Sequence, residues 1–410
     1  MTEAYNRNGL FVSSEHEPDP LEALVRRAAR QMLQTALEHE VTEFLQRSAY
    51  QRSGEPEEFR GYRNGYARER KVVVGSGAIK VRMPRVSDVP PNHEPFASQL
   101  IKPYQKRSQT LREVFPKLFI EGLATRDFEP ALRCLLGEEA PLSPSTISRL
   151  NGEFKHEYKE WRRASLAALQ IVYLWADAIY LQAGVSDEKA CLLVVIGVDT
   201  TGQKHFLALE EGYRESKESW AQVLRDLKAR GVSDPALAIA DGGLGFWSAL
   251  PEVWPQTKEQ LCWVHKMRNI LDKLPRTERG EAAKCLRAIY LARNRVEAER
   301  LAKGLAAHWS KQYTKAAECL LQALPRLLTF FDFPAEHARH LRTTNPIESV
   351  FASVRLRTKA AKRLRTARCG VHLVFKLLER YAKNWQRLSH PEKLKEVKLP
   401  PGSGASQQVA

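Results

Sequence analysis

The chain has 410 residues, enough for two or three domains with a sizeable core, and its formal net charge is +16. This basic excess favours a polyanionic partner, nucleic acid first, because binding displaces counterions from phosphates; contact with the ribosome or an anionic membrane stays open. The longest charge-free apolar run, residues 190 to 198, is far shorter than the roughly 20 residues of a membrane-spanning helix. The first residues also lack the basic and apolar regions of a signal peptide, so we expect a cytoplasmic protein without membrane contact.

The N-terminal part combines helical and basic segments. Residues 1 to 19 are polar and contain prolines, so we expect a disordered tail, followed by a helix with apolar residues at helical spacing. Basic and aromatic side chains are interleaved between residues 52 and 85, where Arg63, Arg82 and Arg85 are candidates for phosphate contact. A solvated edge hairpin explains the same pattern without DNA.

A helical stretch with breaks follows and predicts a DNA-recognition motif. Residues 108 to 160 have helical character, interrupted by glycines and by prolines. Ser143 or Ser145 suits the cap of a second helix, on which Thr146 and Arg149 are candidates for contact with bases. We interpret this stretch as a helix-turn-helix, although plain helical bundles contain similar helix pairs.

Apolar runs in the middle of the chain predict a mixed α/β core. Strands are expected at residues 171 to 181, 190 to 198, 205 to 209, 236 to 240 and 259 to 263. Helices are expected between the third and fourth strands, between the fourth and fifth, and after the fifth. This order of strand, strand, strand, helix, strand, helix, strand and helix resembles that of ribonuclease H-like folds.

Three acids are candidates for metal binding, and two of them, in the first strand and at the tip of the fourth, stand where folds of the resembling type hold metal ions. Asp177 lies in the middle of the first strand, Asp241 directly follows the fourth, and Glu348 opens a later helix. Carboxylates that converge from separate elements can hold two cations roughly 4 Å apart, which suits phosphodiester chemistry. Each also has a structural alternative: Asp177 as a paired buried carboxylate, Asp241 as the start of a turn, and Glu348 as part of a capping box with Asn345 as N-cap.

Two further patterns accompany the acids. Cys262 and His265 form a C-x2-H unit, and a zinc site that adds His337 and His340 is conceivable, although the spacing is unlike that of compact zinc sites. The segment from residue 355 to 368 is basic and contains no acid, whereas a solvated helix face usually mixes both signs. We therefore predict contacts with DNA phosphates. The candidate residues are Arg355, Arg357, Lys359, Lys362, Arg363 and Arg365.

Several strings occur in a fixed order along the chain. They are Tyr62-Arg63-Asn64-Gly65-Tyr66, Met83-Pro84-Arg85, Trp175-Ala176-Asp177-Ala178-Ile179-Tyr180, Ala240-Asp241-Gly242-Gly243, Cys262-Trp263-Val264-His265-Lys266-Met267-Arg268-Asn269 and Thr343-Thr344-Asn345-Pro346-Ile347-Glu348. With these strings the chain resembles the DDE transposases of the Mutator-like (MULE-type) family of bacterial insertion sequences, over about residues 20 to 385.

The resemblance implies a metal-binding catalytic triad of Asp177, Asp241 and Glu348. It also implies a helical insertion before the catalytic glutamate, a supporting role for the C-x2-H unit and for Asn345, and a basic residue two turns after the glutamate, here Arg355. The expected fold class is α/β, a ribonuclease H-like catalytic core with an all-helical insertion, preceded by a helical, helix-turn-helix-like N-terminal DNA-binding region.

The expected parts follow one another along the whole chain. They are a disordered tail (1 to 19), an N-terminal DNA-binding region (20 to 165) with a helix-turn-helix at about 118 to 155, the first part of the core (170 to 275), a helical insertion (276 to 340), a catalytic helix with a basic segment (341 to 395) and a second disordered tail (396 to 410).

The functional hypothesis is a DNA transposase that uses Mg²⁺, with Mn²⁺ as an alternative. It binds the terminal inverted repeats of an insertion sequence, cleaves the ends with metal-activated water and joins the 3′-OH to target DNA. The expected partners are double-stranded DNA, which places the protein at the nucleoid, and a second copy of the chain, because two ends must be brought together. A transposase-derived DNA-binding regulator and a structure-specific metal-dependent nuclease are the alternatives.

Overall fold

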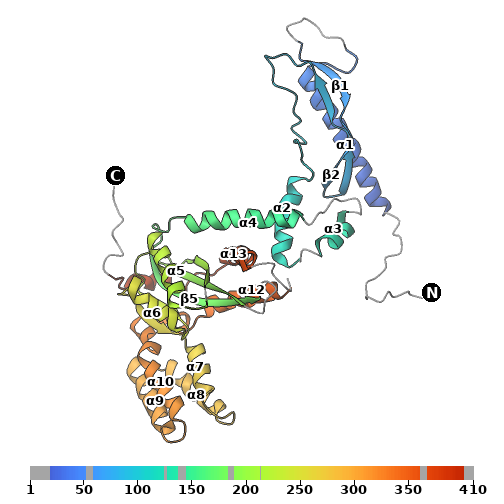
Figure 1. The fold of residues 1–410 in the computed structure, drawn as a ribbon. Helices are drawn as coiled ribbons and strands as arrows, with labels where there is room; N and C mark the ends of the chain where they lie inside the picture. Colours follow the sequence, from blue (N-terminus) through green and yellow to red (C-terminus); the bar gives the residue numbers. More distant parts are fainter. Residues whose placement is uncertain are drawn as a thin grey trace, which may run out of the picture. The chain divides into compact units, whose positions relative to one another are not determined.

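The computed structural model describes residues 19–51, 59–123, 127–136, 145–182, 189–212, 214–360 and 367–400. The chain divides into two compact units, Met1–Ser148 and Arg149–Ala410 (Figure 1). Within the described residues, no helix combines the length and the apolar character that crossing a membrane requires.

The first unit contains both a long helix and strands. Helix α1 (Pro20–Leu45) begins behind Asp19, whose carboxylate accepts a hydrogen bond from the Leu21 backbone N–H. Four short strands form two antiparallel pairs, β1 with β4 and β2 with β3. Their bounds are β1 (Tyr62–Tyr66), β2 (Arg70–Val74), β3 (Gly77–Val81) and β4 (Pro84–Ser87). A small core forms where Leu37 of α1 packs on Val72 and Ile79 of the β2–β3 hairpin.

The N-terminal region, described as helical in the expected fold class, contains strands between residues 62 and 87. The reason lies in the residues themselves: β2 and β3 contain alternating or consecutive β-branched residues around a glycine turn, a pattern that fits a pleated surface better than a helix. This basic and aromatic stretch thus forms antiparallel strand pairs, and its contact with DNA phosphates stays a prediction.

Helices return after the hairpins. They are α2 (Gln109–Glu121), α3 (Phe128–Leu136) and α4 (Ser145–Arg163). The connection between α3 and α4 lies outside the described residues, so the helix-turn-helix stays a prediction. Ser145 is the first residue of α4, while Ser143 falls on the part of the chain that is not described.

The second unit is built on a five-stranded mixed sheet. Its strands are β5 (Ile171–Gln182), β6 (Lys189–Asp199), β7 (Lys204–Gly212), β8 (Leu237–Ala240) and β9 (Lys258–Leu261). The spatial order is β7-β6-β5-β8-β9, in which the first three strands run antiparallel to one another and β8 and β9 run parallel to β5. Apolar residues fill nearly every position of the central strands, as expected for strands covered on both faces.

Helical crossovers make the parallel pairing of β8 and β9 with β5 geometrically feasible, since parallel neighbours cannot be joined by a tight turn. Helix α5 (Lys217–Ala229) joins β7 to β8, and α6 (Leu244–Val253) joins β8 to β9. The two helices pack together through Trp220 and Phe246, whose ring centroids are 5.1 Å apart. The Ser216 hydroxyl caps α5 by accepting a hydrogen bond from the Ser219 backbone N–H.

A group of helices follows β9 and α7 (Trp263–Leu271). It consists of α8 (Arg279–Tyr290), α9 (Arg295–Trp309) and α10 (Thr314–Leu327), followed by the short helices η2 (Thr329–Asp332), η3 (Ala335–His337) and α11 (Ala338–Leu341). Figure 1 shows α8, α9 and α10 together next to α7, and α10 and η2 pack against β9. The predicted all-helical character of this stretch is thus observed, and the two 3-10 helices η2 and η3 lie between α10 and α11.

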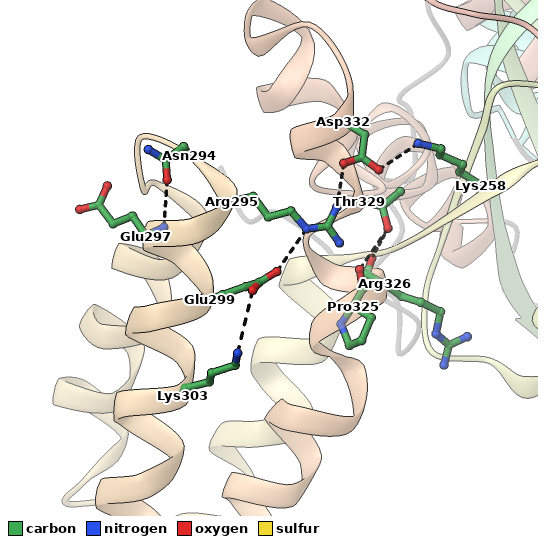
Figure 2. A network of polar contacts seen from close by, with 10 residues as sticks. All are labelled: Lys258, Asn294, Arg295, Glu297, Glu299, Lys303, Pro325, Arg326, Thr329 and Asp332. Carbon is green, nitrogen blue, oxygen red and sulfur yellow. Dashed lines mark hydrogen bonds and ion pairs between the residues drawn. The ribbon is translucent and has the colours of Figure 1, made fainter.

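Asp332 ties these helices to the sheet. Figure 2 shows its carboxylate between two cations: Oδ1 accepts a hydrogen bond from Nη1 of Arg295 at 2.7 Å, and Oδ2 accepts one from Nζ of Lys258 at 2.9 Å. Arg295 also pairs with Glu299 on the next turn of α9. One acid therefore joins α9, η2 and β9.

The chain then returns to the sheet. Helix α12 (Asn345–Ala360) packs against β5, and α13 (Ala367–Ala382) packs against β7. Trp161 of α4 stacks on Phe206 of β7 with ring centroids 4.5 Å apart, so α4 also belongs to the packing of this face. A last short helix, η4 (Pro391–Glu396), precedes the end of the described residues.

Candidate active site

Asp177 interrupts an otherwise apolar central strand. In β5 it lies opposite Val194 of β6, and its Oδ1 accepts a hydrogen bond from the Ala178 backbone N–H at 2.8 Å. Burial, reinforced by the charges of Asp241 and Glu348, raises the pKa of Asp177 to about 7, although the Ala178 N–H and His265 act in the opposite direction. The negative charges of Asp241 and Glu348 thus act on Asp177.

Asp241 follows β8 at the position that the parallel register assigns to it. Ala176 pairs with Ala240, so Asp177 and Asp241 are the next residues on two adjacent parallel strands. The Asp241 carbonyl oxygen accepts a hydrogen bond from Nε1 of Trp247 at 2.6 Å, and its Oδ1 accepts one from the Gly243 N–H at 2.9 Å. Asp241 therefore has the turn role considered above, and within the described part of the chain no hydrogen bond to its Oδ2 is found.

Glu348 is held near the start of α12 by a neighbouring hydroxyl. The Thr344 hydroxyl lies 2.6 Å from Oε1 of Glu348, and Nδ1 of His265 lies 3.6 Å from the same oxygen. The carbonyl oxygen of Thr344 accepts the backbone N–H of Glu348, which makes Thr344 the N-cap. The prediction that Asn345 is the N-cap of a capping box is therefore wrong by one residue. Asn345 is the first residue of α12, and it is exposed.

Cys262 and His265 lie beside Glu348. Cys262 is buried at the end of β9, where its Sγ is 3.4 Å from the backbone nitrogen of Thr344 and 3.3 Å from its hydroxyl. The thiol of Cys262, followed by the charges of Glu348 and Asp177, raises the pKa of His265 to about 9 against the effect of burial. A protonated His265 would offset part of the negative charge of the acids.

The zinc site with His337 and His340 is not formed. Both ring nitrogens of the buried His337 are engaged, Nδ1 with the Tyr173 hydroxyl and Nε2 with the His390 carbonyl oxygen, each at 3.0 Å. Nε2 of His340 lies 3.2 Å from the Ser389 hydroxyl. The two histidines therefore serve as hydrogen-bonding residues in a separate part of the unit.

The donor set of the acids suits a hard divalent cation. Among the described residues, Cys262, His265 and Glu348 bring potential ligand atoms within 4.8 Å of one another, and that set includes only one of the three acids. In this structure the Glu348 carboxylate is directed towards His265 and Thr344. Asp177 and Asp241 add oxygen donors from two adjacent strands, and oxygen is the preferred ligand atom of Mg²⁺ and Mn²⁺.

The residues proposed for DNA contact differ in their surroundings. Arg82, Arg85, Arg149 and Arg355 are exposed. Arg63 is partly buried, with its guanidinium 2.8 Å from the Thr42 hydroxyl and 3.6 Å from Glu38. It therefore also contributes to packing between α1 and β1.

The prediction for Arg357 does not fit this structure. Only 6% of Arg357 is exposed, and burial lowers its pKa. The side chain of an arginine on α12 faces the interior when the residue lies on the buried face of the helix, whatever the charge of its neighbours in sequence. The side chains of Thr146 and Lys359, and residues Lys362, Arg363 and Arg365, lie outside what the structure describes.

Two residues near the acids were not predicted from the sequence. Thr344 contacts both Cys262 and Glu348, and its sequence signals are its position directly before the helix start and its place in the string that ends on Glu348. Glu215 lies in the loop before α5, where burial and the negative charge of Asp241 raise its pKa. No periodicity or motif marks Glu215, because only the fold brings that loop to the end of β8.

Comparison with protein families identifies the class of this chain. The family described as "Transposase, Mutator family" matches residues 6–388, which is most of the chain. The chain therefore belongs to the Mutator family of transposases, as the sequence strings indicated.

Individual relatives agree with this assignment. The chain is 45% identical over 281 residues to the transposase for insertion sequence element IS6120 of Mycolicibacterium smegmatis, covering 68% of this chain and 87% of that protein. It is 42% identical over 271 residues to the transposase for IST2 of Acidithiobacillus ferrooxidans, covering 66% and 92%. With the transposase for ISRM5 of Rhizobium meliloti (strain 1021) it shares 30% identity over 364 residues, 88% of each chain.

Proposed function

We propose that this chain is a metal-dependent DNA transposase whose second unit is a ribonuclease H-like catalytic core. The strand order β7-β6-β5-β8-β9, with three antiparallel strands followed by two parallel ones, supports this fold. The observation that carries the proposal is the register of β5 and β8, which places Asp177 and Asp241 side by side, with α12 and its Glu348 packed against β5.

Asp177, Asp241 and Glu348 are the residues that would hold two Mg²⁺ or Mn²⁺ ions. Such ions, when bound, activate the attacking oxygen and stabilise the leaving oxygen of a phosphodiester. Thr344 orients the Glu348 carboxylate, and Trp247 fixes the backbone at Asp241. Asp177 is largely buried, and electrostatic interactions are stronger in such surroundings than in water.

The reaction then proceeds in two displacements at phosphorus. In the first, a water oxygen bonds to the phosphorus at the end of the element, and the bond from phosphorus to the 3′ oxygen breaks and leaves a free 3′-OH. In the second, that 3′ oxygen attacks a phosphorus of the target DNA, and a target 3′ oxygen leaves. No covalent link to the protein is formed, so the chain provides binding, orientation and proton acceptance.

The DNA partner is supported by the charge of the chain and by exposed basic side chains. The net charge is +16, and Arg149 and Arg355 are exposed on α4 and α12. We assign recognition of the terminal inverted repeats to the N-terminal region with α4, and backbone contact to α12 and the basic segment after it. Two ends must be joined, so the active form contains at least two copies acting at the nucleoid.

The test is a cleavage and joining assay with DNA that carries the terminal inverted repeats of the element. Mg²⁺-dependent nicking at the ends followed by strand transfer supports the transposase. Binding without nicking would instead identify a DNA-binding regulator, and cleavage without joining would identify a nuclease.

A further inference from the structure

We infer that Glu215 is a fourth carboxylate of the active centre, and that it binds a divalent cation together with Asp241. This inference rests on the proposed function. It concerns a residue of the loop between β7 and α5, outside the predicted triad.

The two oxygens of Glu215 have different surroundings. Oε1 accepts a hydrogen bond from the Tyr180 hydroxyl at 2.8 Å, and Tyr180 lies on β5, the strand of Asp177. Oε2 faces Asp241: a Cβ built on Gly243 would lie 2.8 Å from Oε2 of Glu215 and 2.9 Å from Oδ1 of Asp241. The two carboxylates therefore border the same small space above Gly243.

The glycines after Asp241 make this approach feasible. A Cβ on Gly245 would come within 1.9 Å of the Glu215 carbonyl oxygen, so any larger residue there would push the loop away. Gly243 and Gly245 both have negative φ, so they are required for space and not for backbone conformation. The run Asp241-Gly242-Gly243-Leu244-Gly245 thus brings the Glu215 loop next to the end of β8.

A purely structural role explains Glu215 poorly. Asp199, on the neighbouring β6, is an example of a structural carboxylate in this unit. It accepts hydrogen bonds from Thr201 and Gln203 and pairs with His205. Burial alone would raise the pKa of Asp199, but these contacts hold it below the usual value. Glu215 differs from Asp199: the hydrogen bond found for its carboxylate among the described residues comes from the Tyr180 hydroxyl and reaches Oε1 alone.

Two carboxylates that face each other in a half-buried site repel unless a cation or a proton lies between them. Oxygen donors from Glu215 and Asp241 suit Mg²⁺ or Mn²⁺, which bind through carboxylates and keep several waters. In this arrangement Tyr180 is a positioning residue, because it holds Oε1 and leaves Oε2 directed at Asp241.

The experiment measures Mn²⁺ binding to the full-length protein without DNA, by calorimetry and by electron paramagnetic resonance. The variants are Glu215→Gln, Asp241→Asn and, as a matched control, Glu218→Gln, an exposed glutamate in the first turn of α5. We expect Glu215→Gln to weaken Mn²⁺ binding about tenfold or more, Asp241→Asn to weaken it further, and Glu218→Gln to bind as the unaltered protein does.

The outcomes separate this inference from the proposed function. Unchanged binding in Glu215→Gln, with a loss in Asp241→Asn, overturns the role of Glu215 and leaves the triad in place. Unchanged binding in Asp241→Asn overturns the proposed metal site itself. If Glu215→Gln does not fold, Tyr180→Phe tests the inference instead, because it removes only the hydroxyl that holds Glu215. We expect Tyr180→Phe to lose less Mn²⁺ affinity than Glu215→Gln, but a measurable amount. Full Mn²⁺ affinity in Tyr180→Phe would contradict the inference.

Discussion

The hydroxyl of Thr344 lies 2.6 Å from Oε1 of Glu348, within a single turn at the start of α12. The same hydroxyl is 3.3 Å from Sγ of Cys262 at the end of β9. A hydroxyl has one proton, and the shorter contact identifies the carboxylate as its acceptor. Thr344 therefore fixes the acid of the helix relative to the edge of the sheet.

Replacing Thr344 by valine tests this contact. Valine keeps the shape and removes the hydroxyl, and a hydrogen bond to a charged group contributes about 1.5 to 3 kcal/mol, so we expect DNA cleavage to slow by about tenfold to a hundredfold. Thr344→Ser keeps the hydroxyl and should retain most of the rate. Equal rates for the valine and serine variants would show that Thr344 does not orient Glu348.

The pH dependence of metal binding follows from the environment of Asp177. Because burial raises its pKa to about 7, this carboxyl holds a proton below that pH and must lose it to bind a cation. We expect the Mn²⁺ affinity of the unaltered protein to rise with pH and to level off above about pH 7, as measured by calorimetry. An affinity that is constant between about pH 5.5 and pH 8 would contradict the burial argument.

The same shift has a consequence for stability. A carboxyl whose folded pKa exceeds its unfolded pKa of 3.8 binds more protons when folded, so its contribution to the free energy of unfolding decreases as pH rises from about 4 to about 7. Asp177→Asn removes this cost. We expect the metal-free variant to be more stable than the unaltered protein by about 1 to 3 kcal/mol above pH 7, in urea unfolding. A lower stability would mean that Asp177 has a structural partner.

Asp332 allows a prediction about the helices beyond β9. Its two ion pairs, with Arg295 and Lys258, are partly exposed, and such pairs contribute at most about 1 kcal/mol each. Asp332→Asn should lower the free energy of unfolding by about 1 kcal/mol and leave Mn²⁺ binding unchanged. Glu281→Gln, which removes the more exposed pair with Lys284, is the control and should have no measurable effect. A decrease of more than about 3 kcal/mol in the free energy of unfolding would indicate that these ion pairs stabilise the fold more than expected for partly exposed pairs.

Arg355 and Arg149 test the division of DNA binding. Arg355→Ala should weaken binding to any duplex and reduce the slope of log affinity against log salt by up to about 0.9 for a lost phosphate contact. Arg149→Ala should instead reduce the preference for terminal-repeat DNA over random duplex in competition binding. If Arg149→Ala lowers both affinities equally, recognition lies elsewhere in the chain.

The sheet of the second unit was predictable because its signals are local. Residues 190 to 198 and 236 to 240 are continuous apolar runs, and the helix after Ser216 has both its cap and its periodicity in the sequence. Asp177 and Asp241 stand out for the same reason, since each is an acid in or directly after an apolar strand. The proximity of the two acids could not be predicted from the single strands, because it depends on the order of the strands in the sheet.

Other features depend on contacts that sequence patterns do not encode. The N-cap of α12 is Thr344 instead of Asn345, because both residue types can cap and only the packing against Cys262 selects one. Arg357 looks like its basic neighbours in sequence, yet its helical position turns it inward. Glu215 meets Asp241 only because glycines at the start of α6 admit its loop.

The most direct test of the account replaces Asp241 by asparagine and measures binding and cleavage of element-end DNA in the presence of Mg²⁺. The change keeps the size of the side chain and the hydrogen bond to Gly243, and it removes the negative charge of the carboxylate. We predict that the variant binds the terminal repeats as tightly as the unaltered protein and no longer cleaves them. Cleavage at an undiminished rate by Asp241→Asn would contradict the assignment of the active site.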